Sequence, residues 1–328
     1  MNDMHYLVTG GAGYIGSHIC LRLAELGHGV TVLDDFSSGH RWAVAGQEVV
    51  EADLRDLSQL RRVLSGRDFD GVFHFAAKSL VGESGKKPVY YFQNNVSGTA
   101  NLLEVVLEAG WRDCVFSSTA AVYGNPATEK ITEAHPLKPI NVYGQTKRVM
   151  EELLSAVHEQ GHCNAACLRY FNAAGAAPEQ GLGEWHEPET HLIPNILRQA
   201  AGDDVSLTIF GDDYPTPDGT CIRDYIHVLD LADAHIKAMA LLHQQGGFHQ
   251  LNLGNGQGYS VREVLSACEQ AVGEPIAYNI GMRRPGDPPR LVADAERACA
   301  MLDWRPVKDL QAIVESAWLW EQRRRNMA

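Results

Sequence analysis

Thr9-Gly10-Gly11-Ala12-Gly13-Tyr14-Ile15-Gly16 carries the strongest structural signal in this chain of 328 residues. Gly10, Gly13 and Gly16 stand three residues apart, between an apolar run at 4–9 and a helix-period pattern at 15–26. In such a loop the first glycine permits a tight turn, the second lets a pyrophosphate approach the backbone, and the third lets helix and strand pack closely. Free amides at the start of the helix then face the phosphates. The stretch therefore predicts a dinucleotide-binding unit.

Strand and helix patterns alternate on both sides of this loop. The expected strands cover 4–9, 30–33, 71–75, 114–117 and 165–169, and the expected helices cover 15–26, 57–64, 88–109 and 142–160, with Gly27, Gly110 and Gly161 as C-terminal stops. This alternation predicts an α/β fold with a Rossmann-type, doubly wound parallel sheet covered on both faces. After Asn172 the composition changes: the sequence becomes rich in Gly, Ala and Pro, and the expected elements are shorter. We expect a dinucleotide domain at 1–172 and a smaller α/β substrate-binding lobe at 173–328, with some segments returning to the first domain.

Acidic residues stand at the end of the expected strand at 30–33 and at the end of a presumed further strand just before Asp53. Asp34 ends Val30-Thr31-Val32-Leu33, where a carboxylate can accept hydrogen bonds from both hydroxyls of an adenosine ribose and would repel a ribose phosphate. NAD is therefore favoured over NADP. Asp35 can share this role, or it can be a turn or cap residue. Asp53, with Leu54 beside it, can meet the adenine, but an N-cap for the following helix explains Asp53 equally well.

Tyr143-Gly144-Gln145-Thr146-Lys147 places a tyrosine one helical turn before a lysine. Both side chains then share one helix face, so the ammonium can stabilise the phenolate. Moving a phenol from a pKa of about 10 to near neutrality needs roughly 4 kcal/mol, which one cation about 4 Å away supplies at an effective dielectric near 20. On this spacing alone an ordinary exposed pair would be the better interpretation. Together with the glycine loop, Tyr143 becomes a candidate proton-transfer group.

Composition excludes several classes of function. The net charge is −13, which argues against nucleic-acid binding because phosphates need a cationic face. The chain has neither signal-peptide features at its start nor a run of eighteen apolar residues, so we expect no membrane partner and a cytoplasmic protein. Its seven cysteines form no CxxC pair, and His74, His191 and His227 stand singly beside apolar residues. We therefore expect reduced cysteines, structural histidines and no metal.

The glycine spacing, the Tyr-Lys pair and the hydroxyl residue Thr119, in Phe116-Ser117-Ser118-Thr119-Ala120-Ala121, together resemble the extended short-chain dehydrogenase/reductase family. Within it the chain is most similar to the nucleotide-sugar 4-epimerases. The matching runs are 9–18, 74–84, 94–99, 169–172 and 210–228, so that the likeness covers nearly the whole chain. The resemblance implies NAD as cofactor and a UDP-sugar as substrate, with UDP-glucose and UDP-galactose interconverted at the fourth sugar carbon.

The resemblance also implies roles for single residues. Tyr143 would take the proton of the 4-hydroxyl, Lys147 would hold the nicotinamide ribose and lower the pKa of the phenol, and Thr119 would orient the hydroxyl. Phe75 and Phe171 can equally be core residues. The cofactor residues implied in this way are Tyr14, Ile15, Phe75, Asn94 and Phe171.

On the substrate side, Arg223 and Arg284 match positions that take the diphosphate, because guanidinium groups pair bidentately with phosphate. Asn172 would contact the substrate near Tyr143, and Asp287 would suit the uridine ribose. Each of these residues alone can be a surface or loop residue. Because all of them stand at the positions that the family uses for its substrate, they together indicate the binding site.

Two positions depart from the pattern or leave the specificity open. Ser79 stands where some relatives have a lysine, and Lys78 lies one place earlier, so either can contact the pyrophosphate. Leu291 is intermediate between the bulky residue that restricts the pocket to plain hexoses and the small residue of other relatives. Activity on UDP-N-acetylhexosamines is therefore an alternative. The helices at 88–109 and 142–160 resemble the pair that forms a homodimer in relatives.

Other classes of protein share the fold. Nucleotide-sugar dehydratases place an Asp-Glu pair directly after the strand threonine and decarboxylases place a Glu nearby, but this chain has Ala120 and Ala121 there. Elimination is therefore disfavoured. A non-catalytic NAD sensor would have no reason to keep Thr119, Tyr143 and Lys147 in register, so the sequence favours an enzyme.

Overall fold

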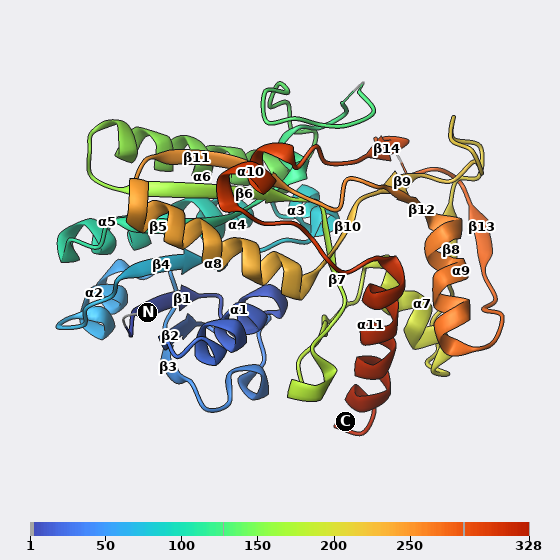
Figure 1. Cartoon of the computed structure of the whole chain (residues 1–328), viewed down its shortest axis with the longest axis horizontal. Coiled ribbons are helices and arrows are strands. Elements are labelled where there is room, and N and C mark those ends of the chain that lie inside the picture. Colours follow the sequence, from blue (N-terminus) through green and yellow to red (C-terminus); the bar gives the residue numbers. More distant parts are fainter. Residues whose placement is uncertain (1–2, 127, 285, 328) are drawn as a thin grey trace.

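The computed structural model describes residues 3–126, 128–284 and 286–327. At its centre lies a seven-stranded sheet in the order β11-β6-β5-β4-β1-β2-β3 (Figure 1), in which every neighbouring pair is parallel. Its strands are β1 (His5–Thr9), β2 (Gly29–Asp34), β3 (Glu48–Glu51), β4 (Gly71–His74), β5 (Asp113–Thr119), β6 (Asn164–Tyr170) and β11 (Phe248–Leu253). All carboxyl ends of these strands therefore meet at one edge, where ligands bind in open α/β sheets.

Helices cover both faces of this sheet, and the side chains at the centre of its strands are fully buried. One face packs against α1 (Tyr14–Glu25), α8 (Val228–Gln245) and α10 (Glu296–Leu302), with Ile19, Leu231 and Ala298 in a single core. The other packs against α2 (Leu57–Leu64), α5 (Gly98–Ala109) and α6 (Val142–Glu159). The predicted doubly wound α/β fold is confirmed. Burial on both faces is also why the strands are apolar without alternation.

The predicted helix at 88–109 contains an irregularity. It consists of α4 (Pro88–Tyr91), a π-helical turn, η2 (Phe92–Ser97), and α5, which ends at Gly110 in the left-handed conformation with φ 80°. One turn of π-helix inside a helix frequently marks a functional site, because the widened turn redirects side chains. Here it carries Asn94 and Asn95.

A second group of elements lies beside the sheet, on the right of Figure 1. Helices α7 (Leu192–Ala200), α9 (Val261–Val272) and α11 (Leu310–Arg324) share a separate apolar core that includes Ile196, Val264 and Ile313. Its small sheets have the orders β10-β7, β12-β9-β14 and β13-β8. Their strands are β7 (Asn172–Ala174), β8 (Thr208–Phe210), β9 (Ile222–Arg223), β10 (Tyr225–His227), β12 (Tyr259–Ser260), β13 (Asn279–Gly281) and β14 (Arg290–Leu291). The remaining elements are η1 (Arg41–Val44), α3 (Val81–Lys86), η3 (Ala120–Val122) and η4 (Pro178–Gln180).

The chain crosses between the two groups more than once. Strand β11 and helix α8 come from the second half of the sequence, yet β11 pairs with β6 in the large sheet and α8 packs on that sheet. The division into domains at 1–172 and 173–328 stays a prediction.

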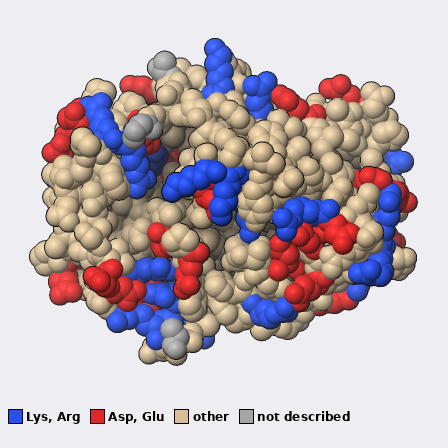
Figure 2. Space-filling view, turned by 180° about the vertical axis from the view of Figure 1, so that it is seen from behind, with Lys and Arg blue, Asp and Glu red and all other residues tan. Residues whose placement is uncertain are grey.

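No helix among the described residues is long and apolar enough to cross a membrane. Each of the seven cysteines is unpaired, and Cys299 is half-buried while the others are buried. On the face drawn in Figure 2, acidic and basic side chains are intermixed.

Candidate active site

The glycine loop has the backbone geometry that its sequence predicts. Gly10 has φ 70°, and a side-chain carbon there would lie 2.5 Å from the amide nitrogen of Ala76. A side-chain carbon at Gly16 would overlap the carbonyl oxygen of Gly10, so only glycine lets α1 begin this close to the loop. The N-cap of α1 is Gly13, which has no side chain to cap the first amides. These amides are available to an anion.

A pocket opens beside this loop and encloses about 580 Å³, its open mouth included. It brings together most of the predicted cofactor residues, which come from the ends of β1, β2 and β4, from the segment after β3, and from the π-helical turn. The predicted residues in its walls are Gly10, Gly13, Asp34, Asp35, Asp53, Leu54, Phe75 and Asn94.

The carboxylates of this pocket are held in different ways. Asp34 is buried and accepts hydrogen bonds from the backbone amides of Ala12 at 3.0 Å and Phe36 at 2.8 Å. Burial raises the pKa of Asp34, and these bonds oppose the shift. Asp35 accepts from the amide of Ser37 at 2.9 Å, so it does stabilise a turn as well as line the pocket.

The N-cap interpretation of Asp53 is wrong. Helix α2 is capped by Asp56, whose carboxylate accepts from the amide of Gln59 at 2.9 Å. Asp53 instead pairs with Arg55 at 2.5 Å, and its side chain remains at the pocket.

Five predicted cofactor residues lie outside the walls of the described pocket: Gly16 and Lys147, together with Tyr14, Ile15 and Phe171. The hydroxyl of Tyr14, at the start of α1, donates to the carbonyl of Gly175 at 2.6 Å. This bond connects α1 to the segment after β7. Ile15 packs against the main core, and Phe171 packs against a small cluster with Tyr123.

Lys78, rather than Ser79, belongs to the pocket. Lys78 is one of its walls, and its ammonium donates to the hydroxyl of Ser37 at 2.7 Å. Ser79 is exposed. Of the two residues, Lys78 is therefore the one placed to meet a phosphate.

The candidate catalytic hydroxyls meet where β5 ends and α6 begins. Asn141 caps α6 by accepting from the amide of Gly144 at 2.8 Å, which places Tyr143 in the first turn. The amide of Tyr143 donates to the hydroxyl of Ser84 at 3.2 Å. At the end of β5, the side chain of Thr119 lies close enough to the Tyr143 side chain to influence its phenol. A substrate hydroxyl between these two groups could exchange a proton with the phenol.

Lys147 lies one turn further along α6, and its ammonium is hydrogen-bonded to the backbone of β5. Its Nζ atom donates to the carbonyl of Ser117 at 2.7 Å and lies 6.0 Å from the centroid of the Tyr143 ring. Burial lowers the pKa of Lys147 to about 7, although the charge of Glu151 opposes this. Burial raises the pKa of Tyr143 to about 12, although the nearby hydroxyl of Thr119 opposes this. In the protein without cofactor, desolvation therefore has the larger effect on the phenol, and the expectation that the Lys147 cation lowers its pKa stays a prediction.

The predicted substrate residues form a second group. The guanidinium of Arg223 in β9 forms an ion pair with Asp287, and Leu291 in β14 pairs with Arg223 in the backbone register. Arg284 lies over the ring of Phe210, 4.2 Å from its centroid.

Leu291 and Asn172 connect this group to the hydroxyl site. Leu291 packs with Phe171 against the cluster that contains Ala120, directly after Thr119. The amide of Asn172, at the start of β7, donates to the carbonyl of Asp224 at 3.0 Å. The structure therefore brings Leu291 to the hydroxyl end of β5, as the predicted specificity role requires.

Residues 6–254 match the model of the NAD dependent epimerase/dehydratase family, which is most of the chain. The chain belongs to this family. It is 48% identical over 320 residues to a UDP-glucose 4-epimerase of Halalkalibacterium halodurans, and the match covers 97% of this chain and 96% of the relative.

Solved structures of the epimerase/dehydratase family agree. A UDP-glucose-4-epimerase from Stenotrophomonas maltophila with bound NAD and formylated UDP-arabinopyranose is 40% identical, with a TM-score of 0.96 over 99% of this chain and 100% of that one. A UDP-glucose 4-epimerase from Bifidobacterium longum in complex with NAD+ and UDP is 37% identical, with a TM-score of 0.93 over 98% and 99% of the two chains. Members of this family so similar in sequence and shape support the predicted resemblance.

Asn95, which the sequence analysis did not single out, connects the glycine-loop pocket to helix α6. Asn95 is fully buried in the π-helical turn. It accepts from the amide of Lys78 at 2.8 Å and donates to the hydroxyl of Thr146 at 3.0 Å. Asn95 thus fixes the pocket wall relative to the helix of Tyr143. The sequence feature that could have indicated this role is the pair Asn94-Asn95 within an otherwise apolar helix pattern.

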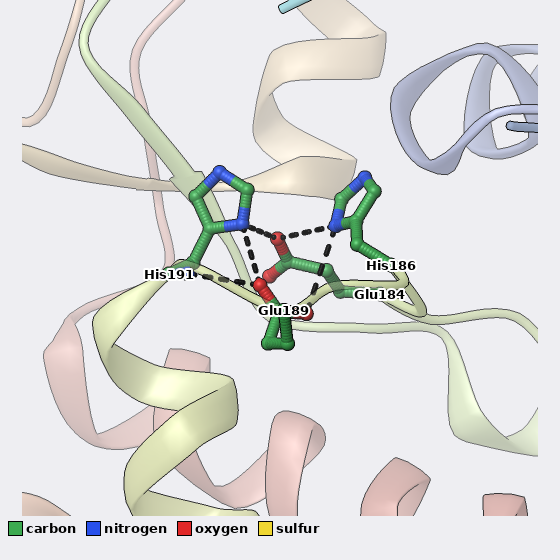
Figure 3. A group of neighbouring side chains, drawn as sticks. All are labelled: Glu184, His186, Glu189 and His191. Carbon is green, nitrogen blue, oxygen red and sulfur yellow. Dashed lines mark hydrogen bonds and ion pairs between the residues drawn. The ribbon is translucent and has the colours of Figure 1, made fainter. Parts of the chain in front are cut away.

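The expectation that His191 stands alone is also wrong. His191 contacts Glu184 and Glu189, each at 2.8 Å, and His186 lies beside them (Figure 3). Burial opposes protonation of His186, but the two glutamates raise its pKa to about 9. Spacing alone could not reveal this cluster, because the chain folds back on itself between these residues.

The other two histidines are structural, as predicted. The ring of His74 bonds the hydroxyls of Thr9 at 2.7 Å and Thr99 at 2.8 Å. His227 caps α8 by accepting from the amide of Leu229 at 3.1 Å.

Proposed function

We propose that the protein interconverts UDP-glucose and UDP-galactose at the fourth sugar carbon through a transient keto sugar, with NAD as cofactor. One observation carries this proposal: Thr119, at the end of β5, and Tyr143, in the first turn of α6, lie beside each other, and Ala120 and Ala121 follow where dehydratases place acids. The arrangement supports proton exchange with one hydroxyl. It offers no acid for expelling water.

The residues that fit NAD are those of the glycine-loop pocket. Amides of the loop and the first turn of α1 would face the pyrophosphate, Asp34 would accept from the adenosine ribose, and Lys78 would neutralise phosphate charge. A nicotinamide cofactor held by these residues would supply reversible hydride transfer at the fourth sugar carbon, so that no net oxidation occurs.

The proton is moved by protein groups. Tyr143 would take the proton of the 4-hydroxyl and give it back after the keto sugar has turned over, while Thr119 holds the oxygen in line. The raised pKa of Tyr143 means that its phenol needs further positive charge before it can act as a base at neutral pH. Lys147, whose Nζ lies 6.0 Å from the centroid of the Tyr143 ring, is the candidate for that charge.

The substrate should be gripped at its diphosphate rather than its sugar, because a tightly held ring could not turn over. Arg223 and Arg284 suit the diphosphate, and Asp287, now paired with Arg223, suits the uridine ribose. Asn172 follows β6 on the side of the site where the sugar would lie. For the pyrophosphate to bind, it must compete with Asp287 for Arg223.

Leu291 bears on the alternative that N-acetylated sugars are also turned over. Its side chain is intermediate in size and packs with Phe171 beside the end of β5. A larger residue there would leave less room for an acetamido group. We propose plain hexoses as the main substrates, and a non-catalytic role as NAD sensor is disfavoured because Thr119 and Tyr143 lie together.

We also propose a homodimer formed through the π-interrupted helix and α6. The first of these exposes Val89, whose exposed fraction is 68%, and Phe92, at 37%. Apolar residues in one exposed stretch favour a partner. Light scattering on the purified protein tests this. A cytoplasmic location is part of the proposal, in keeping with unpaired cysteines.

The activity is tested on the purified protein with UDP-galactose, without added cofactor, by following UDP-glucose. UDP-N-acetylgalactosamine is the second substrate in the same assay. Turnover of UDP-galactose that is at least tenfold faster supports the main proposal, and comparable rates support the alternative. Protein that contains NAD but turns over neither sugar would support the sensor interpretation.

A further inference from the structure

Four side chains outside the candidate active site converge between η4 and helix α7. They are Glu184, His186, Glu189 and His191, and Figure 3 shows their polar atoms directed toward one another. One ligand atom from each lies within 4.8 Å of all the others. The Nδ1 atom of His191 is 2.8 Å from both carboxylates, and that of His186 is 3.3 Å from Glu184 and 3.7 Å from Glu189.

Two buried atoms of this cluster have no hydrogen-bond partner. They are Nδ1 of His186 and Oε2 of Glu189. The side chain of Glu189 is only 1% exposed, so water does not reach Oε2 to satisfy it. A buried polar atom without a partner is unusual in a native structure and points to a ligand. These two atoms face each other across the centre of the cluster.

The set of donors is that of a transition-metal site. Two imidazole nitrogens and two carboxylate oxygens around one Zn²⁺, with bonds of about 2.0–2.2 Å, would lie roughly 3.3–3.6 Å apart in a tetrahedron. The observed separations of 2.8, 3.3 and 3.7 Å lie on both sides of that value, so shifts below an ångström would suffice for these pairs. Two carboxylates, two neutral imidazoles and one divalent cation also sum to zero charge.

The surroundings hold the ligands in place. The carboxylate of Glu189 also accepts from the amide of His191 at 2.9 Å, and the guanidinium of Arg198 donates to the carbonyl of His186 at 3.3 Å. Such secondary contacts orient metal ligands. The side chain of His191 is 44% exposed, which gives an ion access from solvent.

We propose that Glu184, His186, Glu189 and His191 bind one divalent transition-metal cation, of which Zn²⁺ is the best match. All four positions of a tetrahedron are filled by protein, as in structural rather than catalytic zinc sites. Helix α7 begins directly after His191, and the ring of Tyr14 in the glycine loop lies 6.3 Å from that of His186. The cation therefore ties the start of α7 to the segment just before it, 184–189, which lies beside Tyr14 of the glycine loop. Mg²⁺ and Ca²⁺ fit poorly, since they prefer oxygen ligands.

The proposal is tested by titrating Zn²⁺ into full-length protein that has first been treated with a chelator and freed of it, using calorimetry. We expect one Zn²⁺ per chain with a dissociation constant in the micromolar range or below. Glu189→Gln should weaken binding at least 100-fold. The matched control is Glu187→Gln, because Glu187 is exposed in the same segment and outside the cluster; its affinity should equal that of the unaltered protein. Zn²⁺ should raise the Tm of the unaltered protein but not that of Glu189→Gln.

Circular dichroism establishes that each variant is folded, and His191→Gln, at the most exposed of the four ligands, replaces Glu189→Gln if that variant does not fold. Co²⁺ in place of Zn²⁺ should give the visible spectrum of a tetrahedral site without a thiolate charge-transfer band, since no cysteine belongs to the cluster. Absence of saturable Zn²⁺ binding would overturn the proposal and leave the cluster as an ion-pair network. Equal affinity in folded Glu189→Gln, or a thiolate band, would overturn it in favour of binding elsewhere.

Discussion

The ammonium of Lys147 donates a hydrogen bond of 2.7 Å to the backbone carbonyl of Ser117, two residues before β5 ends at Thr119. This bond anchors a buried cation next to the candidate proton-transfer group. The side chain of Lys147 is almost completely buried, and burial lowers its pKa to about 7. A lysine in such a place costs stability, and proteins retain such groups where function requires them.

Removing that lysine should therefore change stability in a pH-dependent way. The folded pKa of Lys147, about 7, is below its unfolded value of 10.5, so the unfolded state binds more protons between these two values. Stability of the unaltered protein, freed of cofactor, then gains from rising pH across that window. In Lys147→Met this gain is absent, so the Tm of the variant minus that of the unaltered protein should fall by several degrees from pH 7 to pH 10. Calorimetry at both pH values measures it.

The control for this experiment is Lys87→Met, because Lys87 is exposed and pairs with Glu83 on the surface. Its Tm difference should stay nearly constant between the two pH values. A difference for Lys147→Met that is equally constant would contradict the inferred pKa. Turnover of Lys147→Met should be lost in either case.

Tyr143→Phe removes the proton-transfer group but keeps the ring. Since general acid–base groups contribute about 10²- to 10⁴-fold, turnover of UDP-galactose should fall at least 100-fold. Folding and cofactor content, followed by circular dichroism and by release of bound NAD, should not change. Tyr278→Phe, at an exposed tyrosine in the other part of the molecule, is the control. Turnover within a few fold of normal would exclude Tyr143 from the mechanism.

Arg223→Ala should weaken UDP binding more than it slows chemistry. Charge-assisted hydrogen bonds contribute about 1.5–3 kcal/mol, which corresponds to a loss of affinity of roughly 10- to 100-fold. The UDP dissociation constant is measured by calorimetry, and kcat is measured by following the formation of UDP-glucose from UDP-galactose. Arg297→Ala, on the exposed side of α10, should leave both unchanged. An unaltered affinity in Arg223→Ala would show that the diphosphate binds elsewhere.

A buried ion pair behind the site should be important for stability. Arg169 and Glu151 form a bidentate pair in which both side chains are 1% exposed, and Gln250 also donates to Glu151 at 3.0 Å. Glu151→Gln would leave the guanidinium without its counter-charge, which costs about 3–5 kcal/mol. Urea unfolding measures the loss.

The adjacent Glu152 provides the control for that loss, because it pairs with Arg148 in an exposed i, i+4 contact. Glu152→Gln should cost less than about 0.5 kcal/mol. Similar losses of unfolding free energy for the two variants would mean that the buried pair contributes no more to stability than the exposed one.

The sequence was most informative where function depends on the backbone. The spacing of Gly10, Gly13 and Gly16 predicts a turn that only these residues allow, and the structure has that turn. Alternating strand and helix patterns likewise predict the sheet, because apolar strands must be covered on both faces.

The sequence was least informative about where long side chains point. Spacing along α6 puts Lys147 and Tyr143 on one face, but it does not reveal that the carbonyl of Ser117 holds the ammonium 6.0 Å from the ring. The four-residue cluster around Glu189 was missed for a similar reason, since its geometry depends on a loop without a periodic pattern. The first feature arises from contact between two segments, and the second from the conformation of a single loop, 184–191.

UDP-galactose carrying deuterium at the fourth sugar carbon distinguishes the proposed chemistry from other routes. The purified protein should convert it to UDP-glucose with the deuterium still at that carbon, as measured by mass spectrometry and proton NMR. Retention is predicted because the hydrogen leaves the sugar and returns to it within one closed site. Formation of UDP-glucose with deuterium lost to water, or no UDP-glucose at all, would contradict the mechanism.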